Sequence, residues 1–211
     1  MGVIERLTTG ALRALDEAVS PTREHALPPT GDFGLRPDGD DPPDLGEIDR
    51  SPAAVLVPIV RRREPTILLT RRTSELRAHA GQVAFPGGRC EPDDDTPIAT
   101  AIRECQEEIG LDPRHVQPVG LLDDYQTVTG FLVTPFVSLV DPPFELVPDP
   151  GEVAEVFEIP LTQALDESNY RSRACVYRGR QRTFYVLEHP TQYIWGATAG
   201  MLLNLCRRMS R

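Results

Sequence analysis

The sequence contains no lysine, so all 22 of its basic residues are arginine. Acidic residues outnumber them at 32, which gives a formal net charge of −10. A chain with this balance lacks the overall positive field that holds nucleic acid or an anionic membrane surface. We therefore expect no nucleic-acid partner and no membrane partner, although a local arginine cluster can still bind a small anion.

Closely spaced cysteines are also missing. The four cysteines form no CxxC pair, which argues against a zinc site and against a disulfide framework. We expect a reduced, cytoplasmic setting. The N-terminus has no apolar core followed by a small-residue cleavage site, and no apolar run is long enough to span a bilayer. A soluble protein is the expected result.

The length of 211 residues, with 40% hydrophobic content, suits one domain with an extension. We predict that residues 1–50 form the extension. Apolar residues recur at helical spacing from Val3 to Val19, and a connector rich in Pro, Gly and Asp follows from Ser20. The helix would pack on the main domain, residues 51–211, or on a partner chain, so a homodimer is possible.

Residues 51–211 contain more strand signals than helix signals. Short apolar runs predict strands at Ala53–Val60, Thr66–Thr70, Val116–Leu122, Phe131–Val140, Val153–Ile159, Ala174–Arg178 and Arg182–Leu187. Helical spacing predicts helices at Pro97–Ile109 and Thr191–Arg208, with a short turn at Leu161–Leu165. This mixed order predicts an α/β or α+β sandwich.

The predicted helix Pro97–Ile109 carries an unusual number of acids. Thr96 and Pro97 suit the N-cap and the first helical position. A 3.6-residue period places Glu104, Glu107 and Glu108 on one face, opposite the apolar residues, so we expect the three carboxylates to emerge together. Arg103 lies four residues before Glu107, within reach of a charge-assisted hydrogen bond.

Carboxylates gathered on one helix either are solvated or bind a hard cation such as Mg²⁺, which takes oxygen ligands. Gly87 and Gly88, just upstream, let the backbone approach closely and turn a carbonyl toward the same ion. The helix alone does not decide between these alternatives.

The combined spacing favours the cation. Gly88, Asp94 and the run Arg103 to Leu111 resemble the Nudix box, GX5EX7REUXEEXGU. The chain departs from that pattern in three ways: Asp replaces the box Glu, one extra residue is present before Arg103, and Cys105 occupies an aliphatic position. Aligning Asp95 in place of Asp94 moves the extra residue to the other side, so both aspartates are candidates for the box acid.

The segment before the box, LLTRRTSELRAHAGQVAFPGG, resembles the motif LLTXR(S/A)X3RX3GX3FPGG of Nudix enzymes that hydrolyse coenzyme A. Later segments are similar as well, so the resemblance covers about Pro52 to Leu205. It implies a Nudix-type α/β/α sandwich with a mixed central sheet. It also implies hydrolysis of the coenzyme A pyrophosphate bond, with Mg²⁺ or Mn²⁺, to 3′,5′-ADP and 4′-phosphopantetheine, or an acylated or oxidised derivative of it.

Carried onto this sequence, the resemblance assigns metal ligands and substrate ligands. The metal would lie on Glu104, Glu107, Glu108 and Gly88, with Arg103 and Glu152 as further catalytic residues, although Glu152 could be only a loop acid. Arg72, Arg77 and Gly81 would bind substrate, since guanidinium groups bind phosphate oxygens bidentately. Without the motif, surface ion pairs would be the simpler interpretation of both arginines.

Two other functions stay open at this point. One is a Nudix hydrolase of another dinucleotide or of a nucleoside triphosphate. The other is a catalytically silent module that senses coenzyme A. Tyr125, Phe131, Tyr193 and Trp195 could form walls for adenine or pantetheine, although most aromatic side chains simply fill cores.

Overall fold

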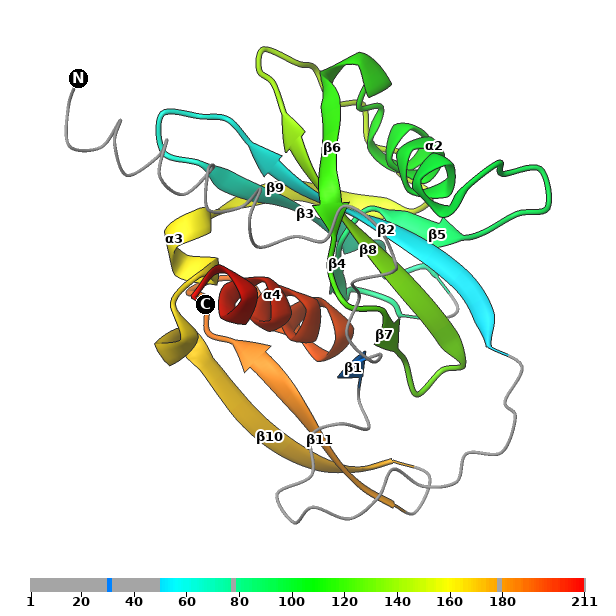
Figure 1. Ribbon diagram of the computed structural model, residues 1–211. Helices are drawn as coiled ribbons and strands as arrows, with labels where there is room; N and C mark the ends of the chain where they lie inside the picture. The colour runs from blue at the N-terminus through cyan, green and yellow to red at the C-terminus, as the bar shows by residue number, and fades with distance from the viewer. Residues whose placement is uncertain (1–29, 32–49, 77–78, 178–179, 211) are drawn as a thin grey trace.

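The computed structural model describes residues 30–31, 50–76, 79–177 and 180–210 (Figure 1). The predicted helix Val3–Val19 and Arg77 lie outside these residues. The described strands are β1 (Thr30–Gly31), β2 (Ser51–Val60), β3 (Thr66–Arg72), β4 (Val83–Ala84), β5 (Gly87–Arg89), β6 (Val116–Leu121), β7 (Tyr125–Gln126), β8 (Phe131–Val140), β9 (Val153–Pro160), β10 (Tyr170–Tyr177), β11 (Arg180–Leu187) and β12 (Ile194–Trp195). The described helices are α2 (Pro97–Ile109), α3 (Leu161–Ala164) and α4 (Gly196–Met209).

The main sheet is mixed. Its order is β1-β7-β8-β2-β3-β4, and β5, β6 and β9 pair with β2, β8 and β3. β2 and β8 run parallel over ten residue pairs, whereas β3 is antiparallel to both β2 and β9. Both parallel strands are buried over most of their length, in keeping with their nearly continuous apolar sequences. The sheet thus has a rigid centre on which both helix layers pack.

Alternate residues of β3 face opposite helix layers. Leu68 belongs to the apolar cluster beneath α2, while Ile67 and Leu69 belong to the cluster that includes α4. Figure 1 shows α2 and α4 on opposite sides of the sheet. The predicted α/β/α sandwich with a mixed central sheet is confirmed.

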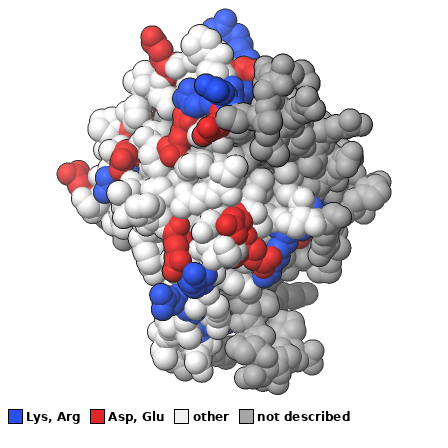
Figure 2. Space-filling model, turned by 90° about the vertical axis from the view of Figure 1, so that its left-hand side faces the viewer, with Lys and Arg blue, Asp and Glu red and all other residues white. Residues whose placement is uncertain are grey.

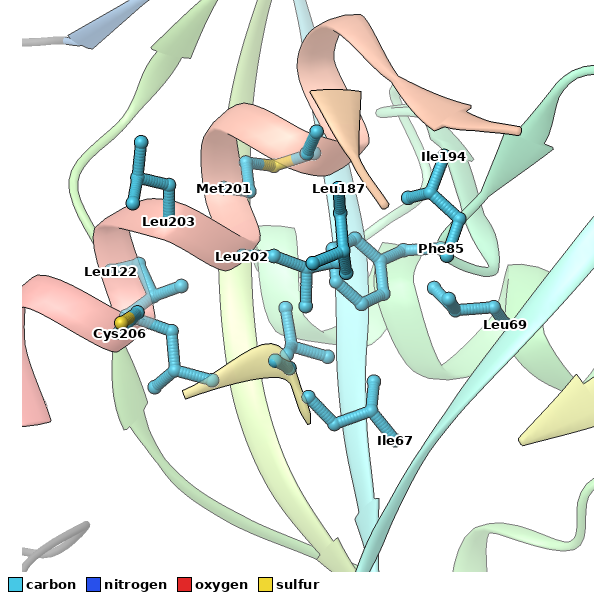
Figure 3. Close-up of a cluster of buried hydrophobic side chains, with 14 of the residues drawn as sticks. Ile67, Leu69, Phe85, Leu122, Leu187, Ile194, Met201, Leu202, Leu203 and Cys206 are labelled. Carbon is cyan, nitrogen blue, oxygen red and sulfur yellow. The ribbon is translucent and has the colours of Figure 1, made fainter. Parts of the chain in front are cut away.

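Helix α4 lies between two sheets. Its apolar residues Met201, Leu202 and Leu203 belong to the same buried cluster as Ile67 and Leu69 of β3, and Leu202 points toward the middle of that cluster (Figure 3). On its other side, Leu187 and Ile194 belong to a three-stranded sheet of order β10-β11-β12. This second sheet covers a helix that would otherwise expose an apolar face.

The predicted start of the last helix is wrong. Thr191–Trp195 is not helical: Ile194 and Trp195 form β12, which pairs antiparallel with Leu187 and Val186 of β11. Helix α4 begins only at Gly196. The helical spacing of the apolar residues continued into this segment, but free backbone groups on β11 provided strand pairing instead. Helix α2 has the predicted bounds.

Basic and acidic side chains are interspersed on the surface that Figure 2 presents. Exposed ion pairs join Arg62 to Glu158, Arg71 to Glu155 and Arg171 to Glu188. Within the described part of the chain, no helix is long and apolar enough to cross a membrane.

A buried polar cluster holds the end of α4 against the main sheet. Asp123 is 2% exposed, and its carboxylate accepts a hydrogen bond of 2.6 Å from Asn204 Nδ2. Arg208 lies 3.5 Å from the same carboxylate and donates to the Leu121 carbonyl. Breaking a buried pair leaves an uncompensated charge, which is costly.

Replacing Asp123 is therefore expected to destabilise the fold. Asp123→Ala should lower the free energy of unfolding by about 3 kcal/mol or more, because it removes the carboxylate that Arg208 and Asn204 share. Glu167→Ala is the matched control, since it breaks an exposed ion pair of the same helix, with Arg207, and should cost less than about 1 kcal/mol. Urea denaturation measures both. Equal effects would contradict the assignment of Asp123 as a buried anchor.

Candidate active site

Helix α2 is capped at both ends, and these caps fix the positions of its acidic residues along the helix. Thr96 is the N-cap, and its hydroxyl accepts a hydrogen bond from the Ala99 amide. Gly110 ends the helix in the left-handed conformation, with φ of 69°. On the helix, Ala101, Cys105 and Ile109 are buried against β2 and its neighbours.

Arg103 is the centre of the polar cluster on this helix. Its Nη1 donates to Glu107 Oε2 at 2.9 Å and to Glu104 Oε1 at 3.1 Å. Its Nε and Nη2 each lie 3.0 Å from an oxygen of Asp94, a bidentate pair. The predicted contact between Arg103 and Glu107 is present, and one guanidinium joins three carboxylates.

Asp94 holds Arg103 in place. The Thr100 hydroxyl and the Glu91 amide both donate to its carboxylate, at 2.8 and 2.9 Å. Hydrogen bonds from Arg103 and Glu91 keep the pKa of Asp94 well below its ordinary value. Asp95 is exposed, so the geometry favours Asp94 as the residue in the box position.

Glu108 is buried, which corrects the expectation that all three carboxylates emerge together. It is 4% exposed, whereas the Glu107 side chain is 60% exposed. The Gly87 amide donates to Glu108 Oε2 at 3.2 Å, and Arg72 Nη1 lies 3.4 Å from Oε1. Burial raises the pKa of Glu108 to about 7, and the Gly87 hydrogen bond and Arg72 only partly oppose this.

Glycine is required at position 88 by the closeness of Glu104. A Cβ atom there would lie 2.5 Å from the Glu104 carboxylate oxygens. Gly87 is equally constrained, because its φ of 149° and the β2 backbone leave no room for a side chain. The predicted close approach of the glycine backbone is therefore present, and Gly88 touches a carboxylate rather than open space.

Glu152 precedes β9 and is exposed. Burial raises the pKa of Glu104, and the charges of Glu107 and Glu152 act in the same direction. The charge of Glu152 also adds to the raised pKa of Glu108. Its carbonyl accepts from the Thr73 amide at 2.9 Å, which fixes this loop to the end of β3.

The residues assigned to substrate binding are only partly brought together. Arg72 lies at the carboxylate cluster, and its buried Nε has no hydrogen-bond partner among the described residues. Gly81 is exposed in a turn with φ of 68°. Two neighbouring arginines are engaged in ion pairs with other acids: Arg61 pairs with Asp141, and Arg71 pairs with Glu155.

The cluster fits a hard divalent cation in its donors and in its charge. Among the described residues, Arg103 contacts Asp94, Glu104 and Glu107, and Arg72 contacts Glu108, so these carboxylates outnumber the guanidinium groups that contact them. In the described residues, no three His, Cys, Asp or Glu side chains are close enough to enclose a metal ion. Mg²⁺ does not need such a cage, because it binds one or two carboxylates together with waters and substrate phosphates.

The anchoring role of Thr100 was not predicted from the sequence. This residue is fully buried and holds Asp94 through its hydroxyl. A hydroxyl residue on the apolar side of the predicted helix was the available signal, since a buried polar group needs a partner.

The raised pKa of Glu108 predicts a specific pH dependence. A folded-state pKa above the ordinary 4.5 contributes stability that is present at low pH and is lost as pH rises through about 7. Without metal, the wild-type protein should lose roughly 2 to 3 kcal/mol relative to Glu108→Gln between pH 5 and pH 8. Glu107→Gln changes an exposed residue and keeps Glu108, so its stability should follow the wild-type pH curve. Urea denaturation in EDTA measures it, and parallel curves for all three proteins would contradict the burial of an ionisable Glu108.

A family model and the sequences of known proteins are similar to this chain, and their descriptions agree with each other. The family model described as NUDIX domain matches residues 50–179. A Photorhabdus laumondii protein named "Uncharacterized Nudix hydrolase NudL" is 45% identical over 157 residues, which cover 74% of this chain and 84% of that protein. A protein of the same name from Citrobacter koseri is 42% identical, over 75% of this chain and 82% of its own length.

A solved structure is also similar to this chain. A Caenorhabditis elegans Ap4A hydrolase matches with a TM-score of 0.46 and 18% identity, over 54% of this chain and 83% of that chain. The family-model match, residues 50–179, includes strands β2 to β10, the glycine loop and helix α2 described above. The chain belongs to the Nudix hydrolase family.

Proposed function

We propose that this Nudix hydrolase cleaves the pyrophosphate bond of coenzyme A, or of an acylated or oxidised derivative of it, in the presence of Mg²⁺ or Mn²⁺. Family membership supports hydrolysis of a nucleoside diphosphate derivative. The choice of coenzyme A rests on the segment Leu68–Gly88 and its motif.

One observation carries the proposal: the motif residue Arg72 lies beside the carboxylates of α2. Leu68, Leu69 and Thr70 are buried in β3, and Arg72 ends that strand with its guanidinium next to Glu108. The motif also includes Gly87 and Gly88, whose backbone contacts Glu108 and Glu104. The coenzyme A motif and the Nudix box thus meet at one place, where a phosphate ligand and the acids lie together.

The reaction adds one water across a phosphoric anhydride. A water oxygen forms a bond to one phosphorus of coenzyme A, and the bond between that phosphorus and the bridging oxygen breaks. The bridging oxygen leaves with the other phosphorus, and the water proton passes to a carboxylate. The products are 3′,5′-ADP and 4′-phosphopantetheine, so atoms and charge balance without any further reactant.

Each residue of the cluster has a role in this reaction that its contacts support. Arg72, with its unpartnered Nε, would bind a phosphate oxygen. Arg103 orients Glu104 and Glu107, and Asp94 positions Arg103. Glu108 and Glu152 are candidates for the carboxylate that accepts the proton.

The proposed metal ligands are Glu104, Glu107, Glu108 and the Gly88 backbone. A divalent cation bound by one or two of these carboxylates, with waters and substrate phosphate oxygens, would neutralise the phosphate charge and lower the pKa of the attacking water. The excess of carboxylates over guanidinium groups favours such a cation. Binding it would also offset the repulsion between Glu104, Glu108 and Glu152.

The main alternative is hydrolysis of another nucleoside diphosphate derivative. Arg77, the second arginine of the coenzyme A motif, lies outside the described residues, so the arrangement around Arg72 alone would also suit such a substrate. A silent coenzyme A sensor is disfavoured, because all three box carboxylates of α2 are retained and oriented by Arg103.

The first test is turnover of coenzyme A by the purified protein with Mg²⁺ or Mn²⁺, beside dephospho-coenzyme A, NADH and ADP-ribose. We expect 3′,5′-ADP and 4′-phosphopantetheine by mass spectrometry, and a rate about 100-fold or more lower for Glu107→Gln, which removes a proposed metal ligand. The reaction in ¹⁸O-water identifies the attacked phosphorus from the labelled product.

Three outcomes separate the alternatives. Preference for coenzyme A supports the proposal, and equal turnover of dephospho-coenzyme A and NADH supports the broader hydrolase. No turnover of any substrate supports the sensor.

Gly88→Ala tests the contact between the glycine loop and Glu104. The new Cβ displaces the Glu104 carboxylate, and a shift of about 1 Å at a catalytic group can lower a rate about 100-fold. The backbone at this position has no positive φ, so thermal unfolding should change little. Arg89→Ala, at the next and exposed position of β5, is the control and should retain activity. A fully active Gly88→Ala protein would exclude Glu104 from the reaction.

A further inference from the structure

Three aromatic side chains gather on the outer face of the small sheet. Ile194 points into the core beside α4, so its neighbours Tyr193 and Trp195 point the other way. Trp195 is opposite Val186 on β11, and Phe184 lies two residues before Val186 on the same face. The Phe184 and Trp195 rings meet edge to face, with centroids 5.4 Å apart.

Tyr193 extends this group into solvent. Its ring lies 6.1 Å from the Trp195 ring, with an angle of 31° between their planes, although the residue is 60% exposed. Among the described residues, the other exposed large hydrophobic side chains are the aliphatic Val147 and Val176. We call Tyr193, Trp195 and Phe184 the aromatic ledge.

Two hydrogen bonds fasten the ledge to strands that lead to the carboxylate cluster. Gln192 Nε2 donates to Glu155 Oε2 at 3.3 Å, and Glu155 lies three residues after Glu152. The Thr198 hydroxyl donates to the carbonyl of Val83 at 2.9 Å, and β4 leads directly into Gly87 and Gly88. Three strand residues span only about 10 Å, so Gln192, next to the ledge in the chain, contacts β9 close to Glu152.

The chemistry of the ledge favours a flat, uncharged ring. Tyrosine and tryptophan faces stack on nucleobases, and such stacking is largely independent of the base. Phe184 packs edge to face against the Trp195 ring, and this contact helps to hold the ring in place before a ligand binds.

We propose that Tyr193 and Trp195 form a stacking subsite for the adenine ring of the substrate. This inference rests on the proposed function for the identity of the ligand and adds the residues that would select its nucleotide half. The pantetheine half contains no ring, so it has no comparable reason to bind here.

Trp195 is the only tryptophan of the chain, so its fluorescence reports on the ledge directly. Titration of the full-length protein with 3′,5′-ADP should quench this fluorescence saturably, whereas 4′-phosphopantetheine and inorganic pyrophosphate should not. Tyr193→Ala should weaken 3′,5′-ADP binding about tenfold, and Tyr193→Phe, which keeps the ring, should bind nearly as the wild type does. Val176→Ala, at another exposed position of the same small sheet, should bind unchanged.

The assay separates this inference from the proposed function because it needs no turnover. If coenzyme A is not hydrolysed but 3′,5′-ADP still quenches Trp195 fluorescence in a Tyr193-dependent manner, the aromatic ledge is supported as a binding subsite and the substrate assignment is contradicted. If coenzyme A is hydrolysed with the same KM by wild type and Tyr193→Ala, and Trp195 is not quenched, the ledge is overturned. A raised KM with unchanged kcat in Tyr193→Ala, together with the quenching, supports it.

Discussion

The candidate site depends on the contacts of one guanidinium group. Arg103 joins Asp94, Glu104 and Glu107, and without it the two helix carboxylates would repel each other at one turn of α2. The bidentate pair with Asp94 fixes the plane of the guanidinium, so Glu104 and Glu107 are held by a group that is itself held. Lysine would not replace it, because an ammonium group cannot present this fork of donors. The acids of α2 are thus oriented before any cation binds.

Glu108 shows what such a site costs the fold. Its carboxyl is buried between α2, the glycine loop and Arg72, and burial raises its pKa to about 7. Near neutral pH the Glu108 carboxyl must therefore either stay protonated or lower the free energy of unfolding by being charged. Perturbed groups of this kind gather at functional sites, where stability is given up for chemistry. A bound cation would reduce this cost, because a positive charge beside Glu108 favours its charged form.

Local signals in the sequence predicted helix α2 with both of its ends, because Thr96, Pro97 and the apolar spacing act within the helix itself. They also predicted the contact between Arg103 and Glu107, because these two residues are only four positions apart in the sequence. The burial of Glu108 could not be read in the same way, since it depends on how Gly87 and Arg72 approach from other strands. The strand β12 was missed for a similar reason: two residues show no periodicity, and their pairing depends on β11.

The segment from β4 to β5 connects the two sides of the sheet. At Val83 its carbonyl accepts from Thr198 of α4, and at Gly87 its amide donates to Glu108 of α2. Between these points, the Pro86 carbonyl accepts from the Leu56 amide of β2, which anchors the segment to the centre of the sheet. Five residues, Val83 to Gly87, therefore join the two helix layers. Because those residues are fixed at three points, a shift at either end is resisted by the sheet, and the spacing between the two contacts is set by the fold.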